Sequence, residues 1–343
     1  MFIIRPVKEE DIDQVVALAA QAKAGLTTLP HDRKILMQRI EESVASFHKN
    51  VDKAQGELYF FVLEDLSNKK VLGTCAIVAR IGGFDPFYTY EIKTTVKASK
   101  LLNVKKEIQY LQLLKQHSGP SEIGTLFLSP EARKSGNGRL LSLSRFLFMA
   151  QYPQRFQQEV IAELRGVLDE KGRSPFWNAV CKHFFEIDFK KADLMGMEDK
   201  TFIAELIPQH PIYIPLLPKE AQEVVGKVHK NTQPAEFFLL QEGFHFMNEV
   251  DIFEAGPVVG ARLQEVRSIS ESREVVVGGI AESLEYGHDC LIANVQSFEG
   301  FRVVLGCLRI DEEKVVTVER SVAQKLNVVQ GDKIRFVELR ARS

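Results

Sequence analysis

The sequence predicts an α+β protein in which a large mixed domain is followed by a small β-rich domain. Three observations lead to this class. The chain has 343 residues, which is long for a single hydrophobic core. Segments with helical and with strand periodicity alternate up to about residue 259, whereas short apolar strands joined by turns follow from about residue 260. We therefore expect one domain over residues 1–259 and a small β-barrel-like domain over residues 260–343.

Composition and charge are those of an ordinary soluble globular protein. Apolar residues make up 45% of the chain, charged residues 26%, and the formal net charge is -2. This balance indicates neither nucleic acid nor an anionic membrane as a partner. No apolar run approaches the roughly 20 residues that span a bilayer, and the start of the chain lacks the features of a signal peptide. Four cysteines without a CxxC pair predict free, mostly buried thiols in a reduced, cytoplasmic setting; they are Cys75, Cys181, Cys290 and Cys307.

The first third of the chain predicts a strand, two helices and a hairpin. Apolar periodicity places the strand at residues 2–7 and the helices at 9–22 and about 32–49. Two apolar runs within residues 57–80 flank a polar turn at 67–70, which is a hairpin pattern. Residues 84–121 mix aromatic and polar side chains without a clear period, so we expect an irregular insertion there.

The middle of the chain alternates strands and helices. We expect strands at residues 122–130, 159–169 and 202–208, and helices in the second part of 133–150, at 174–185 and at 219–229. Ser174 and Pro175 fit the N-cap and the first position of the helix at 174–185. Residues 234–259 read as a helix closed by Gly243, followed by a strand.

The most informative segment is a glycine-containing loop between a predicted strand and a predicted helix. It consists of Arg133, Lys134, Ser135, Gly136, Asn137, Gly138 and Arg139. The two glycines allow backbone torsions and a close approach that a Cβ atom would prevent. Successive N–H groups can then point into one concavity, the helix adds its positive N-terminal end, and the basic side chains add charge. Together these features predict a site for a pyrophosphate.

The spacing of the loop separates the candidate cofactors. The loop matches neither GxxxxGK[ST] of nucleoside triphosphate sites nor GxGxxG of dinucleotide sites. It matches R-x-x-G-x-G, the pyrophosphate loop of the GNAT-type acyl-CoA N-acyltransferases, although a plain glycine-rich turn with basic surface residues is an equal alternative on the motif alone. The order of elements around the loop favours the first interpretation. It implies a GNAT-like fold with a splayed mixed or antiparallel sheet, in which CoA pairs with the backbone of Leu126, Phe127 and Leu128 while their side chains pack in the core.

Over almost its whole length the chain resembles the arginine N-succinyltransferase family, including the paired chains that act on arginine or ornithine. The stretches that carry the resemblance are IRPV (4–7), GLTTLP (25–30), TLFLSPEARKSGNG (125–138), AELRGVLDEKGRSPFW (162–177), FIAELIPQHPIY (202–213), EAQEVVGKVH (220–229), EGFHF (242–246) and VDIFEAGP (250–257). The resemblance implies transfer of the succinyl group of succinyl-CoA to the α-amino group of L-arginine, or of L-ornithine, in arginine catabolism. It also implies a homo- or hetero-oligomer with a related chain.

His229 is the residue to which the resemblance assigns the role of proton donor. A histidine can act as an acid near neutral pH, and the end of a predicted helix favours its charged form. From the residues alone, a C-terminal cap on that helix is an equally good explanation of His229.

Substrate contacts are less sharply indicated. An acceptor with a carboxylate, an ammonium and a guanidinium needs basic and acidic partners, and Glu163, Arg165, Ser174 and the Thr27–Thr28 turn are candidates. Solvated strand ends and helix caps explain these residues equally well. No group of residues has metal-ligand spacing and no GxSxG nucleophile motif occurs, so we expect no metal and a direct transfer in a ternary complex. Two other functions stay open: a GNAT enzyme for another acyl-CoA or amine, and a non-catalytic or regulatory partner of a related acyltransferase.

Overall fold

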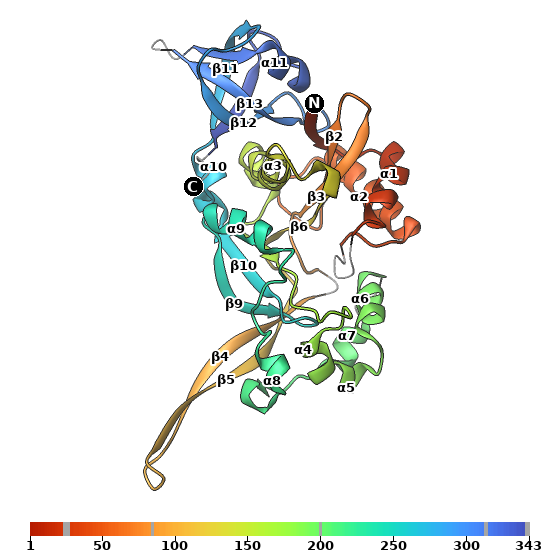
Figure 1. Ribbon diagram of the computed structural model, residues 1–343, viewed down its shortest axis with the longest axis vertical. Coiled ribbons are helices and arrows are strands. Elements are labelled where there is room, and N and C mark those ends of the chain that lie inside the picture. The colour runs from red at the N-terminus through yellow and green to blue at the C-terminus, as the bar shows by residue number, and fades with distance from the viewer. Residues whose placement is uncertain (23–27, 84–85, 199–200, 312–314, 340–343) are drawn as a thin grey trace.

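The structure is a computed structural model that describes residues 1–22, 28–83, 86–198, 201–311 and 315–339. It confirms the predicted α+β class, with a splayed mixed sheet in the centre and a β-rich domain at the C-terminal end (Figure 1). Among the described helices, none is both long and apolar enough to cross a membrane. Three of the four cysteines are buried and Cys307 is partly buried, all as free thiols.

The N-terminal third follows the sequence prediction closely. Strand β1 (Phe2–Pro6) pairs with β2 (Leu58–Asp65), and β2 forms the expected hairpin with β3 (Lys70–Val78). Helices α1 (Ile12–Ala19) and α2 (Arg33–His48) cover one face of these strands. Asp32 begins α2 as an N-cap, because its carboxylate accepts hydrogen bonds from the amides of Lys34 and Ile35.

The central sheet opens between β6 (Ser121–Leu128) and β7 (Glu159–Glu163). The two strands are parallel, and they pair only at Ser121 with Val160 and at Glu122 with Ile161. Further along β6, none of the described strands pairs with the edge that faces β7. On its other edge β6 pairs with β3, and beyond β7 the sheet continues through β10 (Pro257–Arg262) and β9 (His245–Asp251). The predicted splay is therefore present in the structure.

Helix α3 (Asn137–Gln151) follows β6 and is buried along almost its whole length. Its phenylalanines belong to the main hydrophobic core, which also takes in residues of β2 on one side and of the C-terminal strands on the other. The helix is thus held between the central sheet and the C-terminal domain, which fixes the loop that leads into it.

The segment expected to be an irregular insertion is instead a long hairpin. Strands β4 (Phe87–Ser99) and β5 (Val104–Gln116) pair over their full length and project away from the body (Figure 1). The inner half is anchored by β9 and by β8 (Ile212–Tyr213). Because the outer half forms a solvated ribbon, its lysine-rich sequence shows no one-sided apolar alternation, and this missing signal explains the wrong prediction.

Three further predictions between residues 174 and 229 are wrong. The helix expected at 174–185 is split at Val180 into α4 (Pro175–Ala179) and α5 (Lys182–Phe185), and the strand expected at 202–208 is helix α7 (Thr201–Leu206), which follows α6 (Phe189–Glu198). The helix expected at 219–229 ends early as α8 (Lys219–Gln222). After a turn, Gly226 with a φ of 69° donates its amide to Ala255 O, so the chain is directed away from the helix axis instead of continuing to 229.

The C-terminal part contains the expected strands and closes them into a barrel. Its strands are β11 (Arg273–Ala281), β12 (His288–Asn294), β13 (Val303–Ile310), β14 (Val316–Glu319) and β15 (Lys333–Glu338), with helix α11 (Arg320–Leu326) between the last two. They are ordered β12-β15-β11-β14-β13, and β13 pairs back with β12. The domain boundary proposed at residue 260 falls inside β10, which pairs with β7 and β9 of the central sheet.

Candidate active site

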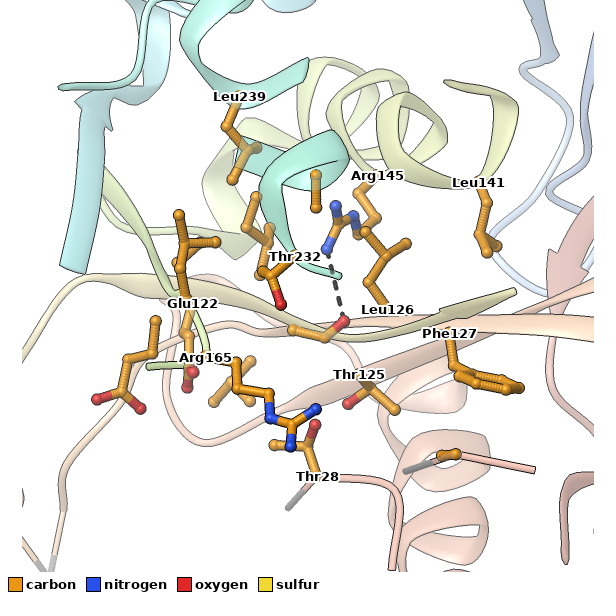
Figure 2. Close-up of a pocket in the computed structure, with 18 of the residues that line it drawn as sticks. Thr28, Glu122, Thr125, Leu126, Phe127, Leu141, Arg145, Arg165, Thr232 and Leu239 are labelled. Atoms are coloured by element: carbon orange, nitrogen blue, oxygen red, sulfur yellow. Dashed lines mark hydrogen bonds between the residues drawn. The ribbon is translucent and has the colours of Figure 1, made fainter. Parts of the chain in front are cut away.

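One large cavity of about 1620 Å³ runs along β6, on both sides of the opening between β6 and β7. Its walls come from segments far apart in the sequence: helix α2, strand β6, the glycine-containing loop, the end of β7, helix α6, the start of α9 (Gln233–Gln241) and the turn after β9. Figure 2 shows part of this wall, with side chains of the two faces converging on the middle of β6. A cavity lined by so many elements is the natural candidate for the active site.

The glycine-containing loop lines this cavity and presents open backbone amides. Ser135 has a φ of 55° and Gly136 a φ of 80°, so two consecutive residues are left-handed and the chain turns sharply into α3. The amides of Arg133, Lys134 and Asn137 are used by carbonyls of the loop. Within the described chain, the amides of Ser135, Gly136 and Gly138 have no hydrogen-bond acceptor. These three N–H groups lie at the positive end of a long helix, where the sequence predicts an anion site.

The basic side chains of the loop differ in their surroundings. Arg133 and Lys134 are exposed, and the Nε atom of Arg133 donates to Leu128 O at 3.0 Å, which ties the loop to the end of β6. The guanidinium of Arg139 lies over the ring of Phe238, with its carbon 5.8 Å from the ring centroid. Asn137 is buried, and its amide side chain donates to Ala132 O at 3.1 Å. Positive charge therefore surrounds the open amides, while Asn137 shapes the loop from within.

Strand β6 carries a strained bulge in the middle of the cavity. Thr125 has a φ of 54°, which is unfavourable for a β-branched residue, and the pairing of β6 with β3 shifts at this point. The strain is held in place by two hydrogen bonds: the Thr74 hydroxyl donates to Thr125 O at 2.9 Å, and Arg145 donates to Gly124 O at 3.4 Å (dashed in Figure 2). A bulge bends its strand and leaves a residue out of the ladder, and this one lies where β6 lines the cavity.

The side chains of β6 behave as the sequence predicts for a strand that acts through its backbone. Phe127 is buried in the core beneath α1 and α2, whereas Leu126 and Leu128 are partly buried and pack against the main core. All three residues line the cavity.

His229 does not sit at the end of a helix, so the helix C-cap considered for it is wrong. Its amide donates to Arg165 O at 2.8 Å, beside the isolated pairing of Val228 with Gly166. Its Nδ1 atom accepts the amide of Asn231 at 3.1 Å. Because Nδ1 is an acceptor, the neutral ring carries its proton on Nε2. His229 is not one of the residues that line the cavity, but Arg165 and Asn231, to which it is bonded, do line it.

The substrate candidates are only partly brought together. Glu163 and Arg165 line the cavity, and Figure 2 shows the Arg165 guanidinium pointing toward Thr28 and Thr125. Ser174 is fully buried outside the cavity lining, where it caps α4 by accepting the Trp177 amide at 3.0 Å. Ser174 is thus the helix cap that the sequence offered as its alternative. Thr27 lies outside the described residues.

Among the cavity-lining carboxyl groups that the sequence did not predict, three come from α6 and from the region at and after the end of β9. Asp193 comes from α6, and Asp251 and Glu254 from the end of β9 and the turn after it. No spacing in the sequence relates these two segments, since the fold alone brings them near Arg165. Within the described ranges, no group of histidine, cysteine, aspartate and glutamate side chains is arranged to hold a metal ion.

Burial sets the protonation of these groups. It raises the pKa of Asp193 to about 7, with the charge of Asp251 acting in the same direction and Arg165 opposing it. Burial also raises the pKa of Asp251 and of Glu254, and it lowers the pKa of Arg165. The Nε atom of Arg165 is buried without a hydrogen-bond partner among the described residues. The cavity therefore has a polar end whose charges are incompletely compensated by the protein.

We expect Asp193→Asn to stabilise the protein at alkaline pH. The folded-state pKa of about 7 lies above the ordinary value of 3.8, so the folded state loses stability as the pH rises between these values and the carboxyl group ionises. At pH 8 the variant should exceed the wild type by on the order of 2 kcal/mol, and near pH 4 the difference should vanish. Denaturant unfolding at both pH values measures this. Asp52→Asn, at an exposed position, is the control, and equal stability of Asp193→Asn and wild type at pH 8 would contradict the raised pKa.

Comparisons with known proteins cover almost the whole chain and agree on one family. The family described as "Arginine N-succinyltransferase beta subunit" matches residues 2–268, and its C-terminal domain model matches residues 273–338. A protein of Escherichia coli (strain 55989) named arginine N-succinyltransferase is 44% identical over 343 residues, which cover 99% of this chain and 98% of that protein. A solved structure, the arginine/ornithine succinyltransferase subunit AI from Pseudomonas aeruginosa, has a TM-score of 0.89 and 37% identity, and it covers 98% of each chain.

Proposed function

The chain belongs to the arginine N-succinyltransferase family, and from this premise we propose that it is an enzyme that transfers the succinyl group of succinyl-CoA to the α-amino group of L-arginine. The products are succinylarginine and CoA. L-ornithine is the second acceptor to consider, since the similar Pseudomonas aeruginosa structure is named for both amino acids. We place the reaction in the cytoplasm, where free thiols such as the four of this chain stay reduced.

One observation carries the acyl-CoA part of this proposal. The open amides of Ser135, Gly136 and Gly138 lie in the same cavity as the stretch of β6 whose β7-facing edge has no partner among the described strands. A pyrophosphate fits the first feature, and an extended pantetheine arm, which has amide groups of its own, fits the second by adding to the strand edge. Arg133, Lys134 and Arg139 supply positive charge around the phosphates.

The reacting centre then lies at the bulge of β6. A CoA arm that runs along this edge brings the thioester to Leu126, whose amide follows the left-handed Thr125. We assign this amide to the carbonyl oxygen, where it stabilises the charge that develops when the amine attacks. The nitrogen attacks the carbonyl carbon, a tetrahedral intermediate forms, and its collapse expels the CoA thiolate.

Two protons must move in this reaction. The attacking amine must lose one, and Asp193 suits this step because it lines the cavity with a pKa of about 7. The departing thiolate gains one, and His229 suits that step because its neutral ring carries hydrogen on Nε2. A thiol has a pKa of about 8.5, so protonation of the sulfur assists departure without being the largest barrier.

The acceptor occupies the polar end of the cavity. Arg165 and Glu163 line it, together with Asp193, Asp251 and Glu254. A substrate that carries a guanidinium, an ammonium and a carboxylate finds partners of both signs there.

A thiol-release assay with a panel of substrates tests the function. We expect succinyl-CoA with L-arginine to give the highest kcat/KM, and L-ornithine a lower one, with acetyl-CoA and L-lysine well below both. Turnover of acetyl-CoA alone would overturn the succinyl assignment. If no pair in the panel were turned over although CoA bound, the chain would be a non-catalytic partner instead.

A further inference from the structure

The cavity wall holds two arginines, apart from those already assigned, that the reaction as described does not use. Arg39 lies on α2 and Arg80 follows the end of β3, and both line the cavity. In each of them the Nε atom is buried and has no hydrogen-bond partner among the residues the structure describes. A guanidinium stays charged at all physiological pH values, so it cannot remove the cost of a buried N–H group without an acceptor by losing its proton.

The two side chains belong to one part of the wall. Ile81 donates its amide to Pro120 O, and Ser121 donates its hydroxyl to Ala79 O, so Arg80 is held beside the start of β6. Glu122, the next residue of β6, is one of the two carboxylates whose charge acts on Arg39. Glu122 and both arginines line the same cavity.

The Nε atoms of these arginines remain without an acceptor. The charges of Glu42 and Glu122 act on Arg39, but within the described part of the chain neither Nε atom, of Arg39 or of Arg80, has a hydrogen-bond partner. A buried N–H group without an acceptor is costly, so a protein that keeps two of them at a cavity wall gains from a ligand that supplies acceptors. The planar fork of arginine matches a carboxylate with two parallel hydrogen bonds.

We propose that Arg39 and Arg80 form a carboxylate-binding subsite of the cavity. The proposal rests on the proposed function, which places two carboxylates in the cavity: the terminal carboxylate of the succinyl group and the α-carboxylate of the amino acid. Either carboxylate offers the two guanidinium groups a negative charge and two oxygen acceptors. The subsite gives the enzyme a means to prefer an anionic partner over a neutral one of the same size.

The test uses Arg39→Met and Arg80→Met, which keep the length of the side chain and remove its charge. The matched control is Arg33→Met on the same helix α2, where Arg33 is exposed and pairs with Asp13. Each variant is compared with the wild type for two pairs of substrates that differ by one carboxylate: succinyl-CoA against butyryl-CoA, and L-arginine against agmatine.

Loss of a charged contact of this kind corresponds to about a 10- to 100-fold change in affinity. If the subsite holds the donor, Arg39→Met and Arg80→Met lose that factor in kcat/KM for succinyl-CoA but not for butyryl-CoA. If it holds the acceptor, they lose it for L-arginine but not for agmatine. If neither ratio moves relative to Arg33→Met, the subsite does not exist.

Ligand-induced stabilisation gives a second readout without turnover. Succinyl-CoA or L-arginine alone should raise the Tm of the wild type, and the variants should lose one of these shifts while they keep the shift caused by free CoA. A wild type that shows neither a shift nor turnover would refute the proposed function. A wild type with both, and variants that match it throughout, would refute only the subsite. We expect the unliganded variants to be at least as stable as the wild type, because each removes a buried Nε–H group that has no acceptor among the described residues.

Discussion

His229→Asn is expected to lower kcat by about 100-fold or more while the protein stays folded. The asparagine oxygen can accept the amide of residue 231, as the Nδ1 atom of His229 does at 3.1 Å, because asparagine readily bonds its own backbone two residues ahead. The substitution therefore keeps the turn and removes the proton on Nε2. Steady-state kinetics over a range of pH measures the loss and shows whether the dependence on the histidine disappears.

The comparison of two variants decides between a chemical and a structural role for His229. His229→Ala removes both the turn contact and the proton, so it should be as inactive as His229→Asn and less stable. His183→Ala, at an exposed position on α5, should leave the kinetics unchanged. Full activity of His229→Asn would remove His229 from the proton transfer and leave it with the turn alone.

Gly138→Val is expected to weaken the binding of CoA by about 30-fold or more, with a smaller effect on kcat. A Cβ atom at this position would meet no protein atom closer than Phe238 Cε2 at 3.8 Å, so the fold accommodates it. Gly138 lines the cavity in the first turn of α3, where the added carbons would occupy the space in which the phosphate approaches the amides. Valine also has a higher helix propensity than glycine, so stability should not fall.

The choice of Gly138 over Gly136 follows from the structure. Gly136 has a φ of 80°, and a Cβ atom on it would come within 2.9 Å of Leu305 Cδ1, so its replacement would distort the loop whether or not a phosphate binds there. Isothermal titration with CoA and with dephospho-CoA, for the wild type, Gly138→Ala and Gly138→Val, measures the effect. An unchanged CoA affinity of Gly138→Val would mean that the pyrophosphate lies elsewhere.

The parts of the fold that the sequence predicted are those with a clear apolar pattern. Strand β6 alternates buried and partly buried residues and α2 buries one face, whereas β2, β3 and α3 are buried on nearly all sides and carry long apolar runs. The hairpin of β4 and β5 lacks this signal because its outer half has no buried face. The short helices between Ser174 and Gln222 pack around Trp177 in a separate core, where tertiary contacts rather than period decide each boundary.

The candidate site also has a part that the sequence shows and a part that depends on the fold. The loop from Arg133 to Arg139 could be singled out from the sequence because its pattern lies in consecutive residues, and the structure places it in the cavity wall, while its role toward a pyrophosphate stays a prediction. The carboxyl groups of Asp193 and Glu254 could not, because they meet Arg165 only through the packing of α6 against the turn after β9. The pKa of a charged residue in such a pocket depends on its burial and on its neighbours, and the sequence shows neither of them.

The contact between the barrel and the glycine-containing loop connects two parts of the molecule that the sequence presents as separate. Leu305 of β13 stands behind Gly136, while β13 also pairs with β1 at Val303 and Ile4. These contacts belong to the interface between the barrel and the rest of the chain. If a fluctuation separated this interface, the left-handed turn at Gly136 would lose its support. Attachment of the barrel and affinity for the coenzyme are therefore linked equilibria. The coupling is reciprocal: a bound coenzyme stabilises the attached state of the barrel by the same free energy that the attached state adds to coenzyme binding.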